Sequence, residues 1–183
     1  MKKTLSLLVA LMMLVCCFAF AESSGDSAGD SAGAPAVEIK LGQVQWAAHG
    51  TKCFAVMTVV LQGDVIVAAH IDEYQWMDAT TSIGVPNSTE GFGASFPEGK
   101  VLASKRVNAA TYSASMTKAG STVALDVNYD AIQAFATGMT IAELEAALEG
   151  KTATEMVDAV SGATLVDTLG YLQGILAAAK AAQ

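Results

Sequence analysis

Cysteine is scarce in this chain, and so are proline and basic side chains. Of the three cysteines, Cys16 and Cys17 lie in an apolar N-terminal run, so Cys53 stands alone in the rest of the sequence. A single cysteine excludes an intramolecular disulfide and a cysteine-based metal cluster there, and we expect it to be a buried, inert thiol. His49 and His70 lie far apart, without paired carboxylates at metal-ligand spacing, so we expect no metal site.

Basic side chains number 10 against 18 acidic ones, which gives a net charge of −8. Two of the basic residues, Lys2 and Lys3, precede the apolar run, so loss of that segment leaves 8 against 18 and a net charge of −10. Nucleic acid is bound by clustered lysine and arginine, and the scattered ones here exclude that class of partner. The acidic surface favours solubility.

The N-terminus has the pattern of an export signal. Lys2 and Lys3 precede an apolar run over residues 5–20, and Ala19-Phe20-Ala21 fits a small-x-small cleavage site. The run is about 16 residues, shorter than the roughly 20 that a spanning helix needs. We therefore predict a signal peptide over residues 1–21 and an exported protein.

Cys16 and Cys17 offer lipid attachment as an alternative to free secretion. Leu14 and Val15 precede them, whereas lipoprotein signals usually place Gly or Ala there. Residues 22–36 form a small, polar Ser/Gly/Asp/Ala segment that cannot bury a core and is typical of a flexible linker. Such a linker suits an anchored protein, so secretion and attachment to the outer face of the cytoplasmic membrane both stay open.

Residues 37–183 suit one domain with a single core. Strands are expected over residues 37–46, 53–61 and 65–72, and Gln62-Gly-Asp64 predicts the hairpin between the last two. Glycine and proline mark a long loop over residues 78–100, and loops of this length are often functional.

The second half of the domain changes to helical periodicity. Short helices are expected over residues 109–118 and 129–137, and Thr140 with Glu143 forms a capping box for a helix through Leu148. Residues 154–160 are expected to form a short strand and residues 165–182 the closing helix. Strands followed by helices predict an α+β fold, a small antiparallel sheet packed by several helices.

The stretch Asp158-Ala-Val-Ser-Gly-Ala-Thr164 lies where the expected strand turns into the closing helix. Gly162 permits a tight turn, and Ala163 is small enough to let a bulky group lie close. Free N–H groups in the first turn of a helix form an anion site, so Thr164 is placed to carry a phosphodiester. The alternative is structural: Ser161 or Thr164 caps the last helix and Asp158 is a turn residue.

At these residues the chain resembles the FMN-binding domain family of the covalent-flavin subunits of sodium-translocating NADH:quinone reductase and the Rnf complex. That family carries Asp-x-x-(Ser/Thr)-Gly-Ala-Thr, matched here by Asp158, Ser161, Gly162, Ala163 and Thr164. The resemblance implies that Thr164 receives FMN in phosphoester linkage from FAD. It also implies a partner, an exported Mg²⁺-dependent flavin transferase, for which Asp158 would be a recognition residue.

Further stretches resemble the Gram-positive surface flavoproteins of extracellular electron transfer, and they run through most of residues 40–183. They are Ile71-Asp-Glu-Tyr-Gln75, Gly84-Val-Pro-Asn87, Val101-Leu-Ala-Ser-Lys105 and Gly120-Ser-Thr122. Those relatives carry the domain in tandem, whereas this chain has one copy and so implies one flavin. Leu165-Val-Asp167 also departs from the Thr or Ser that many members show after the motif.

Aromatic and basic side chains are the candidate flavin contacts. Tyr74 and Trp76 flank Gln75, so in a strand both face one side, and this pair is preferred over Trp46 and Tyr112. Core packing is the alternative for each aromatic residue.

Lys105 and Arg106 are candidates for neutralising the reduced flavin ring, with a solvated surface pair as the alternative. The leading hypothesis is an electron carrier, rather than a stand-alone enzyme. It would accept electrons from a membrane donor and pass them to an extracellular acceptor. A surface binding module without covalent flavin, and the electron-input partner of an extracellular reductase, are the alternatives.

Overall fold

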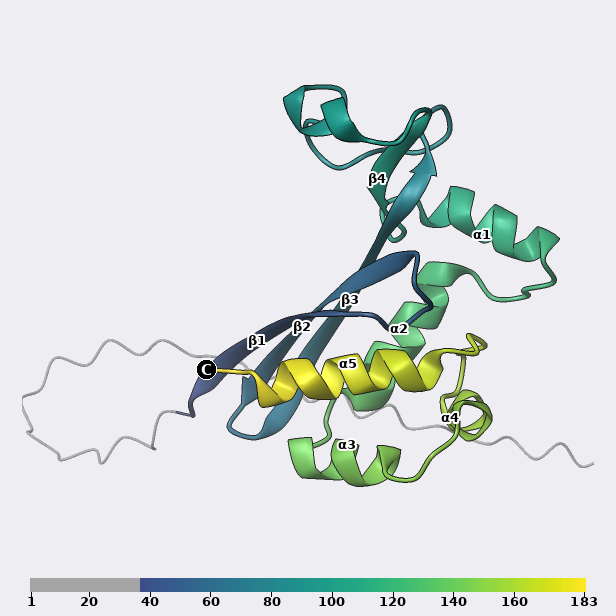
Figure 1. Ribbon diagram of the computed structural model, residues 1–183. Coiled ribbons are helices and arrows are strands. Elements are labelled where there is room, and N and C mark those ends of the chain that lie inside the picture. The colour runs from purple at the N-terminus through teal and green to yellow at the C-terminus, as the bar shows by residue number, and fades with distance from the viewer. Residues whose placement is uncertain (1–36) are drawn as a thin grey trace, which may run out of the picture. The chain divides into compact units, whose positions relative to one another are not determined.

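The computed structural model describes residues 37–183, which form a four-stranded antiparallel sheet with helices along one face (Figure 1). The strands follow chain order across the sheet: β1 (Ile39–Trp46), β2 (Cys53–Gln62), β3 (Val65–Asp78) and β4 (Lys100–Ser104). The predicted α+β fold is confirmed. The expected signal peptide, linker and candidate lipid-attachment cysteines lie outside the described residues.

The hairpin between β2 and β3 was readable from local sequence. Gly63 adopts a φ of 65°, a left-handed conformation that glycine tolerates at no steric cost. β3 continues six residues past the expected end at Asp72, because its far half pairs with β4, with Met77 opposite Val101. β4 and the short helix η1 (Gly91–Ser95) were not predicted. The loop expected over residues 78–100 lies between the end of β3 at Asp78 and the start of β4 at Lys100, with η1 inside it.

Five α-helices follow the sheet: α1 (Ala109–Lys118), α2 (Leu125–Ala136), α3 (Ile141–Leu148), α4 (Ala153–Ala159) and α5 (Thr168–Lys180). α2 and α5 lie against the sheet, and α3 and α4 pack on α5 (Figure 1). The core between sheet and helices is built from apolar side chains such as Met57, Ile71, Ile132, Leu172 and Ile175, all with no exposed surface. Within residues 37–183, every helix is too short or too polar to cross a membrane.

The strand predicted over residues 154–160 is wrong, because this segment forms α4. Thr152 accepts a hydrogen bond from the backbone N–H of Glu155, whose side chain accepts one in return from the Thr152 N–H. This capping box, together with the helix-favouring Ala153, Glu155 and Met156, outweighs the strand propensity of Val157. The capping box predicted at Thr140 is confirmed.

The closing helix begins at Thr168, three residues later than predicted. Gly162, with a φ of 89°, turns the chain after α4. The backbone N–H of Thr164 then donates to the Asn128 side chain at 2.6 Å, and the Thr168 hydroxyl donates to the Leu165 carbonyl at 2.6 Å. The motif therefore links two helices instead of a strand and a helix.

Gly42 marks the closest approach of α5 to the sheet. A Cβ at this position would lie 1.9 Å from the carbonyl oxygen of Ala178. We expect Gly42→Ala to lower the free energy of unfolding by about 3 kcal/mol, because α5 must move away from β1. Gly91→Ala is the matched control, since nothing lies within 4 Å of that Cβ, and it should cost less than about 0.5 kcal/mol. Equal costs in urea unfolding would contradict this packing.

Candidate functional site

The motif presents its polar side chains to solvent. Asp158, Ser161 and Thr164 are exposed, whereas Ala163 is buried in the core. The sequence predicts that the small Ala163 lets a bulky group lie close. In the structure its side chain packs in the core instead. The exposed Thr164 side chain is accessible from solvent.

The alternative interpretation, in which Ser161 or Thr164 caps the last helix, is wrong. The residue that caps α5 is Asp167, and no side chain makes a capping hydrogen bond there, so neither Ser161 nor Thr164 caps this helix. Asp158 lies in α4, and its side chain makes no hydrogen bond within residues 37–183, so its carboxylate does not brace the turn. Neither exposed hydroxyl of the motif caps α5, and the Thr164 hydroxyl makes one long hydrogen bond, to Asn128 Oδ1 at 3.4 Å.

The backbone around Thr164 offers donors for an anion, in a different place from the one expected. The Thr164 N–H is occupied by Asn128, a buried residue of α2. Among residues 37–183, the next three N–H groups, those of Leu165, Val166 and Asp167, have no hydrogen-bond acceptor. Consecutive free N–H groups stabilise a negative charge, so a phosphodiester on Thr164 would find its donors directly after the motif.

Thr164 lies at the edge of a hollow of about 440 Å³, which we call the Thr164 hollow. The hollow lies between the end of α1 and the segment that precedes α5, and its lining residues are Met116, Ala119, Gly120, Ser121, Thr122, Thr164, Leu165 and Val166. Three residues with hydroxyl groups, Ser121, Thr122 and Thr164, and no charged side chain line it. A carboxylate that would repel a phosphate is therefore absent from this lining.

A second, smaller hollow shares part of its lining with the first one. This inner hollow, of about 220 Å³, shares Met116, Leu165 and Val166 with the Thr164 hollow and reaches Tyr112 and Lys105. A third hollow, of about 480 Å³, also adjoins Met116 and extends along α1 to Trp76. All three hollows share Met116 in their lining, and we refer to them together as the groove; Tyr112 and Lys105 line the inner hollow.

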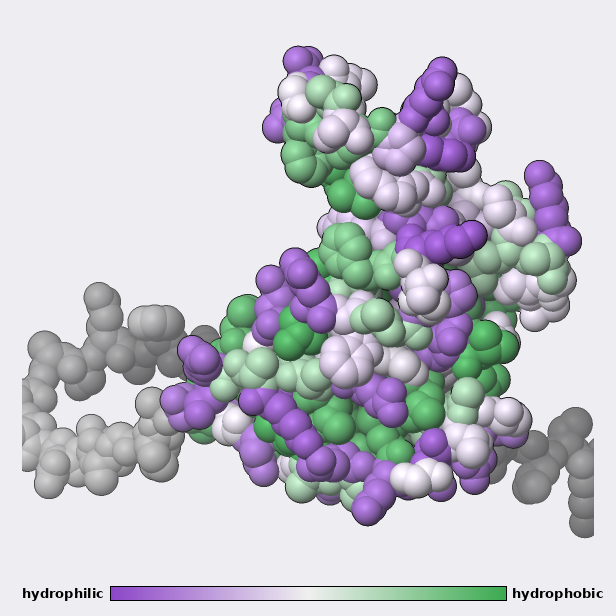
Figure 2. All heavy atoms as spheres, viewed as in Figure 1, coloured by the Kyte–Doolittle hydropathy of each residue, from purple (hydrophilic) through white to green (hydrophobic). Residues whose placement is uncertain are grey.

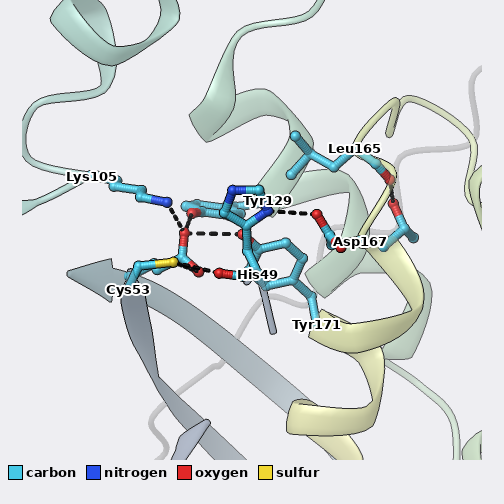
Figure 3. Close-up of polar contacts among 9 residues, drawn as sticks. His49, Cys53, Lys105, Tyr129, Leu165, Asp167 and Tyr171 are labelled. Atoms are coloured by element: carbon cyan, nitrogen blue, oxygen red, sulfur yellow. Dashed lines mark hydrogen bonds and ion pairs between the residues drawn. The ribbon is translucent and has the colours of Figure 1, made fainter. Parts of the chain in front are cut away.

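Lys105, which follows β4 and lines the inner hollow, forms a buried ion pair with Glu73 of β3 (Figure 3). The exposed fraction of the Lys105 side chain is 1% and that of Glu73 is 0%. The hydroxyl groups of Tyr129 and Tyr171 donate to the same carboxylate at 3.1 and 3.0 Å. The ammonium lies 4.8 Å from the centre of the Tyr112 ring.

Burial and charge set the protonation of this cluster. Burial raises the pKa of Tyr129 and Tyr171 well above the usual range, so both remain neutral donors. Burial alone would lower the pKa of Lys105, but the adjacent Glu73 carboxylate outweighs that effect and raises it. The ammonium is therefore held charged beneath Tyr112, so the interpretation of Lys105 as a solvated surface residue is wrong.

Arg106 points away from the groove. Its guanidinium donates to Asp130 at 2.9 Å and to Gln133 at 2.8 Å on α2, and its Nε donates to the Ile71 carbonyl. Of the two predicted basic candidates, the structure therefore brings only Lys105 to the hollow.

Cys53 also contacts the cluster, and it is half-buried, not fully buried as expected. Its thiol donates to the His49 carbonyl, and burial together with the Glu73 carboxylate raises the pKa of Cys53 to about 11. Iodoacetamide alkylates only the thiolate form of cysteine. At pH 8, Cys53 of the folded protein should therefore react about 100-fold more slowly than a thiol with the ordinary pKa of 9.0. The rate should rise as the pH approaches 11. Mass analysis of the Cys53 peptide measures the rate, urea-unfolded chain is the control, and equal rates would contradict the burial.

His49 also lines the inner hollow. Its Nδ1 donates to the Asp167 carboxylate at 2.6 Å, which holds the loop between β1 and β2 against the start of α5 (Figure 3). Asp167 belongs to the segment that carries the free N–H groups, and its carboxylate is turned towards His49. Within residues 37–183, no three histidine, cysteine or acidic side chains gather as metal ligands.

Of the predicted aromatic pair, Tyr74 lies away from the groove and Trp76 lies at its third hollow. Tyr74 stacks on Phe54 at 5.6 Å on the sheet face turned away from the helices, so it does not reach the groove beside Thr164. Trp76 is exposed, packs edge-on against Phe96 and lines the third hollow. Trp46 is tied into the core by a hydrogen bond to the Gly170 carbonyl.

Asn128 and Glu73 stabilise the site, and neither was predicted from the sequence. Asn128 fixes the backbone of Thr164, and a polar residue amid apolar helix positions was its only signal. Glu73 lies on the buried face of β3, two residues after Ile71, and a carboxylate at an apolar position of a strand was a signal for a buried partner. Comparison of the chain with protein-family models, curated proteins and solved structures found no match.

Proposed function

We propose that this protein is an exported electron carrier that holds FMN covalently on Thr164. The observation that carries the proposal is the exposed Thr164 hydroxyl at the edge of an uncharged hollow, followed by three free backbone N–H groups. The motif resemblance supplies the identity of the group. Bound FMN would supply one- and two-electron chemistry at its ring.

The residues around Thr164 fit both the phosphate and the ring of FMN. The N–H groups of Leu165, Val166 and Asp167 would hold the phosphate, and the hydroxyls of Ser121 and Thr122 line the space next to it. Met116 and Leu165 give the groove an apolar wall that would exclude water from a ring.

Lys105 would compensate negative charge that a ring acquires on reduction. The ammonium lies beneath Tyr112 at the inner hollow, and Glu73 with its two tyrosine donors keeps it charged and fixed. A fixed cation near a flavin ring is one of the ways in which a protein tunes the potential of its cofactor. We propose a membrane electron donor and an extracellular acceptor as partners, with a flavin transferase acting before either.

The first test is whether flavin stays with the denatured chain. The full chain is produced with and without an exported flavin transferase, precipitated in acid and washed in detergent, and flavin fluorescence of the pellet is measured. The proposal predicts fluorescence only in protein matured with the transferase. Colourless protein, or flavin that washes into the supernatant, would contradict a covalent link and would favour a binding module.

A further inference from the structure

The two edges of the sheet differ in how they are covered. At the β4 edge, the Val85 N–H donates to the Leu102 carbonyl at 2.8 Å. The Asn108 amide donates to the Ser104 carbonyl at 2.8 Å on the same edge. β1 forms the other edge, and no further strand of residues 37–183 pairs with it (Figure 1). The unpaired N–H and carbonyl groups of such an edge are a template for another strand.

Hydrogen bonds show which residues of β1 face the open side. The Gly63 N–H donates to the Glu38 carbonyl at 2.9 Å, so the backbone groups of Glu38 face β2. Backbone groups alternate in direction along a strand, so those of Ile39 and Leu41 face the open side. The Leu41 carbonyl agrees with this, because it accepts from the Gln183 N–H at 3.4 Å. Within residues 37–183, this long bond is the only one that Ile39 and Leu41 make on the open side.

Residues 37–41, which we call the edge segment, read Val-Glu-Ile-Lys-Leu. Neighbouring side chains of a strand point to opposite faces, and Gly42 lies against α5, so the odd-numbered side chains lie on the face turned away from the helices. There Val37, Ile39 and Leu41 are 58%, 61% and 57% exposed. Three apolar side chains in a row on an open edge form a surface that a further strand would cover.

Two charged side chains alternate with these three. Glu38 and Lys40 lie on the helix side of the sheet, 3.5 Å apart, and 71% and 35% of their side chains are exposed. Figure 2 shows hydrophilic and hydrophobic side chains next to each other where β1 begins, at the left of the view. An exposed charge at a sheet edge can pair with an opposite charge directly across from it on an adjacent strand.

The edge segment is complementary to a second copy of itself. In an antiparallel pairing of two copies centred on Ile39, this residue lies opposite itself, and Val37 lies opposite Leu41 of the second copy. Glu38 then lies opposite Lys40 of the second copy, and the symmetry repeats this ion pair. Apolar pairs and opposite charges across a sheet are stabilising, and like charges there are destabilising. A parallel pairing would bring Glu38 beside Glu38, and an antiparallel one centred on Lys40 would bring lysine beside lysine.

We infer that two copies of this chain associate through antiparallel pairing of their edge segments. Backbone bonds would form between the outward groups of the two strands, and the long bond from Gln183 to Leu41 would give way to one of them. Residues directly opposite each other in a sheet point to the same face, so the two sheets would join with the helices of both copies on one face. Such a short paired segment is typical of a weak, reversible dimer. The contact involves none of the residues around Thr164 and does not depend on a group attached there.

The first test is self-association of the full chain, purified after export. Analytical ultracentrifugation over about 1–300 µM should show a monomer–dimer equilibrium with a dissociation constant below about 100 µM. Ile39→Lys places two lysines at the centre of the pairing and should weaken the dimer at least about tenfold. Gln45→Lys is the matched control, because Gln45 is exposed on the same face of β1 but lies outside the edge segment.

Charge reversal tests the partner and the register together. Glu38→Lys brings lysine opposite lysine in a self-pair, and Lys40→Glu brings glutamate opposite glutamate, so each variant alone should dimerise at least about tenfold more weakly. An equimolar mixture of the two variants restores both ion pairs across the contact and should associate as tightly as the unchanged chain. Lys118→Glu makes the same charge change at the exposed end of α1 and should leave the dimer unaltered.

The mixture also shows that the two variants are folded, because a misfolded chain would not regain a specific contact. A chain that stays monomeric up to about 300 µM would overturn the inference. So would a mixture of Glu38→Lys and Lys40→Glu that associates no better than either variant alone. Equal effects of Ile39→Lys and Gln45→Lys would contradict pairing centred on Ile39.

Discussion

Replacement of Lys105 by methionine should lower the free energy of unfolding by about 3–5 kcal/mol. The side chain is 1% exposed and its ion-pair partner Glu73 is fully buried, so the substitution leaves a carboxylate without its cation in the core. Tyr129 and Tyr171 would still donate to Glu73, but two neutral donors do not replace a charge. Urea unfolding at pH 7 measures the loss.

Two further variants separate the buried pair from a general effect of losing a lysine. Lys180→Met breaks an exposed ion pair with Glu145 and should cost less than about 1 kcal/mol. The double variant Glu73→Gln with Lys105→Met removes both charges and should recover most of the loss. A cost for Lys105→Met no larger than that for Lys180→Met would contradict the buried ion pair.

The second large effect concerns flavin content. Thr164→Val keeps the size of the side chain but removes the hydroxyl that a phosphoester needs, so the chain should carry no covalent flavin after maturation with the transferase. The residue is exposed, and its backbone N–H still reaches Asn128, so the free energy of unfolding should change by less than about 0.5 kcal/mol. Absorbance of the denatured, washed protein measures flavin per chain.

Thr122→Val is the matched control for this loss, because Thr122 lines the same hollow and also carries a hydroxyl. It should retain full flavin content. Equal loss in both variants would mean that the hollow, rather than the Thr164 hydroxyl, determines attachment. Undiminished flavin in Thr164→Val would contradict attachment at this residue.

The predictable part of the fold is the part that short-range sequence determines. Gly63 made the β2–β3 hairpin readable, and the capping box at Thr140 made α3 readable. β4 and the far half of β3 stabilise each other through pairing between residues about 25 positions apart, as with Met77 and Val101, and no local pattern reports such pairing. The segment that became α4 has a mixed pattern, in which its capping box prevailed over strand propensity.

The candidate site shows the same division. The motif is a run of adjacent residues, whereas Asn128, which holds Thr164, lies 36 residues earlier in the chain. The strand expected over residues 65–72 ends before Tyr74 and Trp76, which the structure places in the far part of β3. Which face they occupy relative to Thr164 depends on the helices packed against Glu73, and strand periodicity cannot supply that information.

The most direct measurement is fragmentation mass spectrometry of the tryptic peptide 152–180 from protein matured with a flavin transferase. This peptide carries several hydroxyl groups, among them Ser161, Thr164 and Thr168, so its fragments distinguish the attachment residue. We predict a single FMN-phosphoryl addition on Thr164. An unmodified peptide, or an addition on Ser161 or Thr168, would contradict the account.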